Sequence, residues 1–344
     1  MNTLSPSFVT SKDGTKIAYD AKGKGPLVVC VAGALWTRVE WARSGVADLL
    51  SRSSTVLSYD RRGRGDSTDT SPYSPEREVE DIEALLGAFG GSGSLYGMSS
   101  GAALALSAAS TLGRRVERLA LYEAPYDSSP GGRGRWEAYN RELRTFVSCG
   151  RNGDAVAFFM KFATGTSEER IAQMRRAATW EAMERLAPTL LYDAALLGED
   201  RSLPAAAAAK VVSPTLVVSG SASLPIFAET AKALSRAIPG ARLRILEGQR
   251  HNVQAEAIAP VLAEFFSGRW RARHTERTST TSTRRRGGRR RTDRTPRGRR
   301  AFLGTRGISL TRERRLCPWG WPSSPAALSG WLAGRDGVHP PLVR

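Results

Sequence analysis

The sequence predicts an α/β protein built on a mostly parallel sheet that helices cover on both faces. Short continuous apolar runs, such as Leu27 to Ala32, are typical of strands buried on both faces of a parallel sheet. These runs alternate with segments of helical spacing, and the connections are short. One long segment, residues 127–209, interrupts the alternation and shows helical spacing only.

The expected elements follow in order along the chain. A hairpin opens the sequence, with strands at Ser7 to Thr10 and Lys16 to Tyr19 around the Asp13-Gly14 turn signal. The pattern then predicts strands at 27–32, 55–59, 94–96, 116–122, 215–219 and 242–247. It predicts helices at 39–50, 75–89, 101–112, 226–238 and 253–266.

The interrupting segment is predicted to be an all-helical insert. Helical spacing occurs at 136–147, 155–162, 168–178 and 180–197. An insert that follows a strand of such a sheet should lie over the ends of the strands as a cap.

The net charge of +18 is distributed very unevenly. From Arg269 onward the chain holds twenty arginines, no lysine and four acidic residues, a net charge of +16. The remaining 268 residues carry only +2. We therefore expect a folded domain over residues 1–267 and an Arg-rich tail over 268–344, too poor in branched aliphatic residues to fold and so disordered.

Cysteine usage favours a reducing compartment, because Cys30, Cys149 and Cys317 are far apart and odd in number. We find no signal-peptide core and no run of 18 apolar residues, so we expect a cytoplasmic protein without a membrane partner.

A G-x-S-x-G motif stands where a strand is expected to turn into a helix. Gly97 to Gly101 follows the strand-like Leu95-Tyr96 and opens a run of alanines and leucines. In that context the motif places a serine, here Ser99, on a sharp turn with its hydroxyl exposed beside a helix N-terminus. The alternative is an ordinary Gly/Ser-rich turn.

With this motif the chain resembles the α/β-hydrolase superfamily over about residues 7–267. Three further segments match in the superfamily's order: Val31 to Ala34, Tyr59 to Ser67 and Glu247 to His251. For the Asp60 to Ser67 segment we expect a structural role, since its Gly and Asp residues can shape a tight loop and its Arg residues can bond to backbone carbonyls.

His251 is the predicted general base. The chain has three histidines, and His274 and His339 lie in the tail. The resemblance implies a histidine after the last strand, where His251 falls. A neutral imidazole there can accept the Ser99 proton and return it to the leaving group.

The third catalytic residue departs from the commonest family pattern. That pattern has an aspartate within a few residues of Gly220, but no acidic residue occurs between Asp200 and Glu229. Some members, including certain haloalkane dehalogenases, carry the acid at the end of the preceding strand, where this chain has Glu123. Glu123 is therefore the candidate acid, with Asp127 and a two-member Ser-His site as alternatives.

The oxyanion hole is expected from two backbone amides, those of Ala34 and Ser100, with Leu35 as an alternative to Ala34. Many relatives have His-Gly where this chain has Ala32-Gly33.

A serine in the elbow favours hydrolysis of a small or medium apolar carboxylic ester, thioester or lactone. Apolar residues of the insert and the oxyanion loop could line the pocket, although most could equally form the insert's own core: Leu35, Trp36, Trp136, Phe158, Phe159, Met160, Phe162, Trp180 and Tyr192. We expect no cofactor and no metal. Cofactor-free haloperoxidase-like enzymes and C–C bond hydrolases of the same fold remain open as alternatives.

A different class of function would depend on the tail. Its arginine clusters, such as Arg284 to Arg286, could bind the phosphate backbone of a nucleic acid. A competing hypothesis is that the tail is an extension of a GC-rich gene read in a shifted frame.

Overall fold

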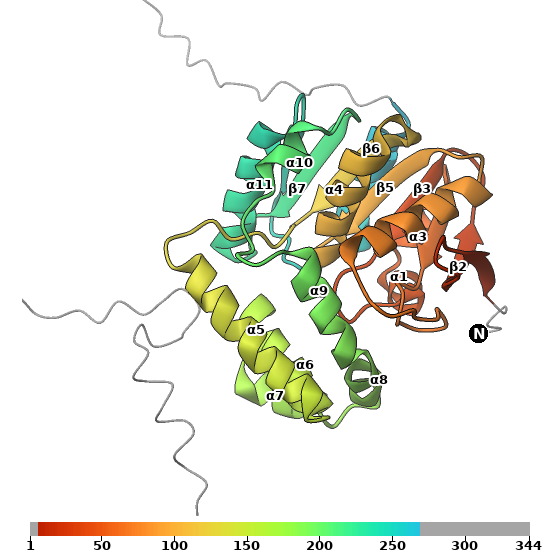
Figure 1. Cartoon of the computed structure of the whole chain (residues 1–344). Coiled ribbons are helices and arrows are strands. Elements are labelled where there is room, and N and C mark those ends of the chain that lie inside the picture. Colours follow the sequence, from red (N-terminus) through yellow and green to blue (C-terminus); the bar gives the residue numbers. More distant parts are fainter. Residues whose placement is uncertain (1–5, 269–344) are drawn as a thin grey trace, which may run out of the picture. The chain divides into compact units, whose positions relative to one another are not determined.

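The computed structural model describes residues 6–268 of the chain, and these residues form an α/β fold around one eight-stranded sheet (Figure 1). The strand order is β1-β2-β4-β3-β5-β6-β7-β8. The strands are β1 (Ser7–Thr10), β2 (Lys16–Lys22), β3 (Leu27–Val31), β4 (Thr55–Tyr59), β5 (Gly93–Met98), β6 (Val116–Tyr122), β7 (Thr215–Gly220) and β8 (Arg242–Leu246). The predicted fold class is thus confirmed.

Only the opening hairpin departs from parallel pairing. β1 pairs with β2, and β2 with β4, in antiparallel register. Every other pair, from β4·β3 to β7·β8, is parallel. The carboxyl ends of β3, β5, β6 and β7 therefore meet at one edge of the sheet, where an α/β sheet commonly binds its ligands.

The continuous apolar runs are strands with both faces buried. All five residues of β3 are buried, and they alternate between two cores. Val29 belongs to the core under α3 and α4, whereas Val28 and Cys30 belong to the core under α1, α2 and α12. This double burial explains why the strand sequence shows no polar alternation.

Helices cover both faces, as predicted. One face carries α1 (Arg38–Ser44), α2 (Val46–Leu50) and α12 (Ala255–Phe266), and the other carries α3 (Pro75–Ala88), α4 (Ser100–Leu112) and α11 (Pro225–Ala237). The prediction of a single helix at 39–50 is wrong. The segment forms two helices, α1 and α2, because Gly45 adopts φ 76° and ends α1.

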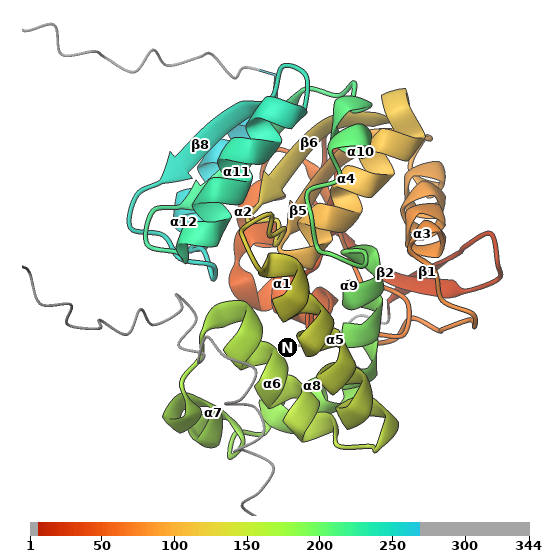
Figure 2. The same ribbon diagram turned by 60° about the vertical axis from the view of Figure 1, so that its left-hand side comes forward.

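Between β6 and β7 the chain forms a helical insertion, whose helices α5–α8 gather beyond one end of the sheet while α9 runs back toward it (Figure 2). Its helices are α5 (Gly132–Ser148), α6 (Asn152–Thr164), α7 (Glu168–Met174), α8 (Thr179–Leu186), α9 (Leu190–Leu196) and α10 (Ala205–Ala209). The predicted helix at 180–197 is interrupted by a 3₁₀ turn, Ala187–Thr189, that contains Pro188. Proline lacks the amide hydrogen that an α-helix needs at this point.

The predicted Arg-rich tail lies outside the described residues, apart from Gly268. Over residues 6–268, none of the helices combines the length and apolar character that crossing a bilayer would require.

Candidate active site

Ser99 lies on a strained turn between β5 and α4. Its backbone angles are φ 56° and ψ −125°, a region that residues with a side chain rarely adopt. The Ser99 amide donates a hydrogen bond to the Tyr122 carbonyl at 2.9 Å, which ties the turn to the end of β6. Ser99 is partly exposed and lies at the edge of the sheet where β5 ends.

The motif's first glycine is required by close packing within the turn. A Cβ on Gly97 would lie 2.4 Å from the Gly101 carbonyl oxygen and 2.7 Å from the Ala102 Cα. Both are backbone atoms, which cannot move aside cheaply. The glycine therefore allows α4 to start directly against β5.

Glu123 and His251 are in direct contact, although 128 positions separate them in sequence. Glu123 Oε2 lies 2.7 Å from His251 Nδ1. The other carboxylate oxygen, Oε1, accepts a hydrogen bond from the Gly220 amide at 2.8 Å. With Nδ1 turned to a buried carboxylate, the remaining ring nitrogen, Nε2, is the one available for proton transfer.

Neighbouring groups fix the positions of these two side chains. The His251 ring stacks on Phe227, with centroids 4.6 Å apart and an interplanar angle of 16°. Tyr122 donates its hydroxyl proton to the Arg250 carbonyl at 2.6 Å, which anchors the histidine loop. Glu123 is 1 % exposed, and its amide donates to the Val218 carbonyl at 3.1 Å. The pair is therefore held between β6, β7 and the loop after β8.

The alternative acid, Asp127, is engaged elsewhere. One of its oxygens accepts hydrogen bonds from the amide and the hydroxyl of Ser129, at 2.9 and 2.5 Å. The other pairs with Arg135 at 3.0 Å. Burial raises the pKa of Asp127, but these bonds outweigh it and hold the pKa below its usual value. Asp127 therefore stabilises the start of the helical insertion, and Glu123 is the carboxylate that contacts His251.

Backbone strain gathers around these residues. Among the described residues, four non-glycine residues have positive φ: Leu35 at 59°, Ser99 at 56°, Glu123 at 48° and Arg201 at 57°. Ser99 and Glu123 stand directly after β5 and β6, and Leu35 lies in the loop four residues after the end of β3, at the same edge of the sheet. Such strain persists only where the surroundings impose it, and it concentrates at functional sites.

Most aromatic residues expected to line a pocket form the insertion's own core instead. Trp136 and Trp180 are buried, and Trp136, Tyr139, Phe158 and Phe162 stack on one another with centroids 4.2 to 6.0 Å apart. Trp36 does line a cavity, of about 560 Å³, between α1, the end of β5 and the start of α12.

The residues expected to form the oxyanion hole lie where β3 and β5 end. Ala34 is partly buried in the loop after β3, and Ser100 is the buried first residue of α4. Sequence reasoning missed Asp193, which reaches this region from the insertion and pairs with Arg61 and Arg64. Its signal was a single acid inside the apolar run Leu190 to Leu197.

Residues 28–264 match the family model described as the alpha/beta hydrolase family. The chain belongs to this family. It is therefore an enzyme of the hydrolase class, with a small-molecule substrate. Among curated proteins, none matches the chain.

Solved structures agree with this assignment. An alpha/beta hydrolase from Sphaerobacter thermophilus is 44 % identical, with a TM-score of 0.67 over 76 % of this chain and 100 % of that one. A bromoperoxidase from Bacillus anthracis is 21 % identical, with a TM-score of 0.62 over 76 % of this chain and 100 % of that one. An enol-lactonase from Burkholderia xenovorans is 23 % identical, with a TM-score of 0.58 over 76 % of this chain and 100 % of that one. The last two share the fold with this chain.

Over residues 6–268, we found no group of three or more His, Cys, Asp or Glu side chains placed to hold a metal ion.

Proposed function

We propose that this α/β hydrolase cleaves small or medium apolar carboxylic esters, thioesters or lactones through an acyl-enzyme on Ser99. The single observation that carries the proposal is the 2.7 Å contact between Glu123 and His251 at the edge of the sheet where Ser99 also lies. A carboxylate on Nδ1 holds the imidazole in the tautomer whose Nε2 can accept a proton.

The reaction would follow the usual two steps of acyl transfer. His251 takes the proton as the Ser99 oxygen attacks the carbonyl carbon, and Glu123 stabilises the imidazolium that forms. The amides of Ala34 and Ser100 stabilise the oxyanion, and His251 then protonates the departing alkoxide or thiolate, which leaves as an alcohol or a thiol. Water, deprotonated by His251, attacks the acyl-enzyme, and His251 returns the proton to the Ser99 oxygen as the acid leaves.

We also propose that the helical insertion acts as a cap over the site and that residues 1–267 suffice for activity. In support, the insertion follows β6, directly after whose last residue Glu123 stands, and α9 returns toward the ends of the strands. The family match ends at residue 264, before the Arg-rich tail begins. Truncation after Ser267 should leave kcat unchanged, whereas a protein that acts through its tail would lose its function.

The proposal is tested with p-nitrophenyl acetate and butyrate. We expect Ser99→Ala and His251→Ala to abolish hydrolysis, while Ser110→Ala on the same helix as the elbow retains the wild-type rate. Mass spectrometry should find a fluorophosphonate adduct on the peptide that contains Ser99. Equal rates in the wild type and Ser99→Ala would refute the proposal.

A peroxidase function is the second candidate, because the bromoperoxidase of Bacillus anthracis shares this fold. Bromination of monochlorodimedone with peroxide and bromide, measured beside ester hydrolysis, separates the two.

A further inference from the structure

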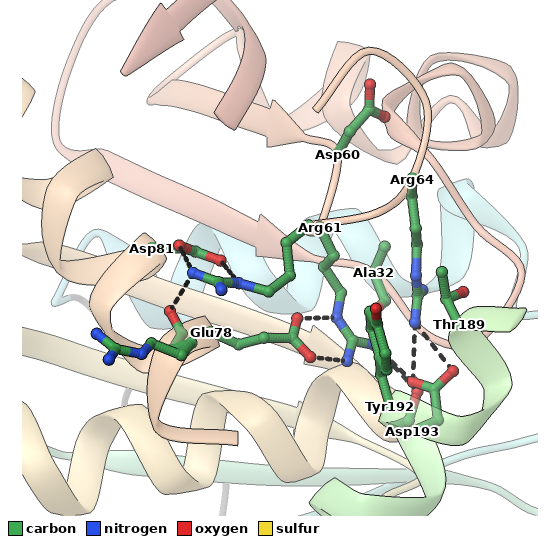
Figure 3. Close-up of polar contacts among 12 residues, drawn as sticks. Ala32, Asp60, Arg61, Arg64, Glu78, Asp81, Thr189, Tyr192 and Asp193 are labelled. Carbon is green, nitrogen blue, oxygen red and sulfur yellow. Dashed lines mark hydrogen bonds and ion pairs between the residues drawn. The ribbon is translucent and has the colours of Figure 1, made fainter. Parts of the chain in front are cut away.

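Four buried charged side chains lie directly behind the loop that carries Ala34. Arg61 and Arg64 come from the loop after β4, Glu78 from α3 and Asp193 from α9 of the insertion. Each of the four is at most 5 % exposed. Two cations thus face two anions in the interior, and Figure 3 shows Arg61 between Glu78 and Asp193, with Arg64 reaching onto Asp193.

The two guanidinium groups contact these acids, the loop and, at 3.5 Å from Arg61, the Ser100 hydroxyl. Arg61 donates two hydrogen bonds to Glu78, both 2.6 Å, and one to Asp193 at 2.7 Å. Arg64 donates to both oxygens of Asp193, at 3.0 and 2.9 Å. Arg64 also donates to the Gly33 carbonyl at 2.7 Å, and Arg61 to the Ala32 carbonyl at 3.3 Å.

The bond to the Gly33 carbonyl controls the direction of the Ala34 amide. The Gly33 C=O and the Ala34 N–H belong to one planar peptide unit, and in a trans peptide they point in opposite directions. A guanidinium that holds the carbonyl on one side therefore fixes the N–H on the other. A charge-assisted hydrogen bond to the oxygen also polarises the peptide and makes its N–H a better donor.

This peptide lies against the predicted nucleophile. A Cβ on Gly33 would be 3.1 Å from the Ser99 Cβ and 3.8 Å from the Ser99 Oγ. The loop is thus close enough for its amide to reach an oxyanion formed on a substrate bonded to Ser99.

Asp193 is what keeps Arg64 in place. The Arg64 side chain is 0 % exposed, and burial together with the neighbouring Arg61 lowers its pKa. Asp193 opposes that shift and holds the Nη2 end of the guanidinium with both of its oxygens, while Nη1 bonds to the Gly33 carbonyl. Burial raises the pKa of Asp193, but Arg64 and Arg61 outweigh it and hold the pKa below its usual value, so the acid is ionised at neutral pH.

We propose that Asp193 is a positioning residue of the hydrolase site: through Arg64 it orients the Gly33–Ala34 peptide so that the Ala34 N–H points to the developing oxyanion. This inference rests on the proposed serine-hydrolase function. It makes α9 of the insertion part of the machinery that stabilises the transition state. The Arg64–Asp193 pair also braces a loop whose residue 32 is an alanine, without a polar side chain of its own.

The test is a charge-balanced double variant, Arg64→Met/Asp193→Leu. It removes one cation and one anion and leaves the Arg61–Glu78 pair intact, a replacement that proteins often tolerate without loss of stability. The matched control is Arg62→Met/Asp81→Leu, which removes another buried arginine–aspartate pair that begins in the same loop. Arg62 donates to the Arg77 carbonyl and to Asp13 rather than to the loop after β3.

Outright removal of one oxyanion donor lowers kcat by about 10²- to 10³-fold. In the test variant the donor is misoriented rather than removed, so we expect kcat for p-nitrophenyl butyrate to fall roughly 10- to 100-fold, with KM within about threefold. The rate of fluorophosphonate labelling at Ser99, which also forms an oxyanion, should fall by a similar factor. The control should keep both rates within about threefold. Arg64→Lys, which retains a donor for the Gly33 carbonyl, should be more active than Arg64→Met.

Three results would overturn the inference. Unchanged kcat and labelling in a folded Arg64→Met/Asp193→Leu variant would show that the Ala34 peptide needs no such brace. An equal loss in the control would show that any buried ion pair of the loop has the same effect. If the wild type shows neither Ser99-dependent hydrolysis nor labelling, the proposed function itself is wrong and the inference falls with it.

Discussion

Replacement of Glu123 by glutamine is the sharpest test of the proposed catalytic site. The substitution keeps the size of the side chain and removes one negative charge 2.7 Å from His251 Nδ1. Oε1 already accepts a hydrogen bond from the Gly220 amide. The glutamine oxygen would therefore stay on Gly220, and its NH₂ group would face Nδ1 and impose the opposite histidine tautomer.

The expected loss follows from the charge alone. Unit charges about 4 Å apart at an effective dielectric constant of about 20 interact with about 4 kcal/mol. This attraction exists only once the imidazolium has formed, so its removal raises the barrier by a similar amount. We therefore expect kcat to fall by about three orders of magnitude, with little change in KM.

The assay is hydrolysis of p-nitrophenyl butyrate by wild type, Glu123→Gln and Asp127→Asn, with circular dichroism as the check on folding. Asp127→Asn should remain within about threefold of the wild-type kcat, because Asp127 bonds to Ser129 and Arg135. A folded Glu123→Gln enzyme that retains a third or more of the wild-type kcat would refute the reasoning. The two-member Ser-His site would then be the better account.

Three further predictions concern acid stability, thiol reactivity and packing. Because the folded-state pKa of Asp193 is lowered, its stabilising contribution is present above about pH 4 and is lost as pH falls through the lowered pKa. Arg64→Met/Asp193→Leu should therefore lose less stability than the wild type between pH 7 and pH 3. An equal loss in the two proteins, measured by urea denaturation at both pH values, would contradict this. Burial raises the pKa of Cys30 to about 12, whereas Cys149 is exposed. Iodoacetamide at pH 8 should therefore modify Cys149 and leave Cys30 unmodified until the protein unfolds, and peptide mass mapping measures both. Gly97→Ala should lower the melting temperature sharply, because the added Cβ meets backbone atoms. Gly87→Ala, whose Cβ would lie in open space on α3, should stabilise the protein by about 0.5–1 kcal/mol. Equal shifts of the melting temperature in the two variants would disprove the packing argument.

The fold was predictable because its signals are local. A run of five apolar residues marks β3, and helical spacing marks the segment around α3, whether or not the partners in space are known. The errors are local too. Gly45 splits one predicted helix and Pro188 interrupts another, since neither break alters the apolar periodicity on which the prediction depended.

The candidate site was predictable where a sequence motif, or a residue type that occurs only once outside the tail, points to one residue. Ser99 stands in a recognisable turn, and His251 is the only histidine outside the tail. Asp193 could not be found in this way. It belongs to the insertion, 129 and 132 positions from its two arginine partners.

By itself the sequence determined the α/β class, the order of the elements, the insertion and the residue types that can carry acyl transfer. The tertiary structure decided which carboxylate meets His251 and which acid neutralises Arg64. The reason is physical: apolar period and turn chemistry are properties of neighbouring residues, whereas a hydrogen bond between Glu123 and His251 exists only after the sheet brings two distant strand ends to the same edge.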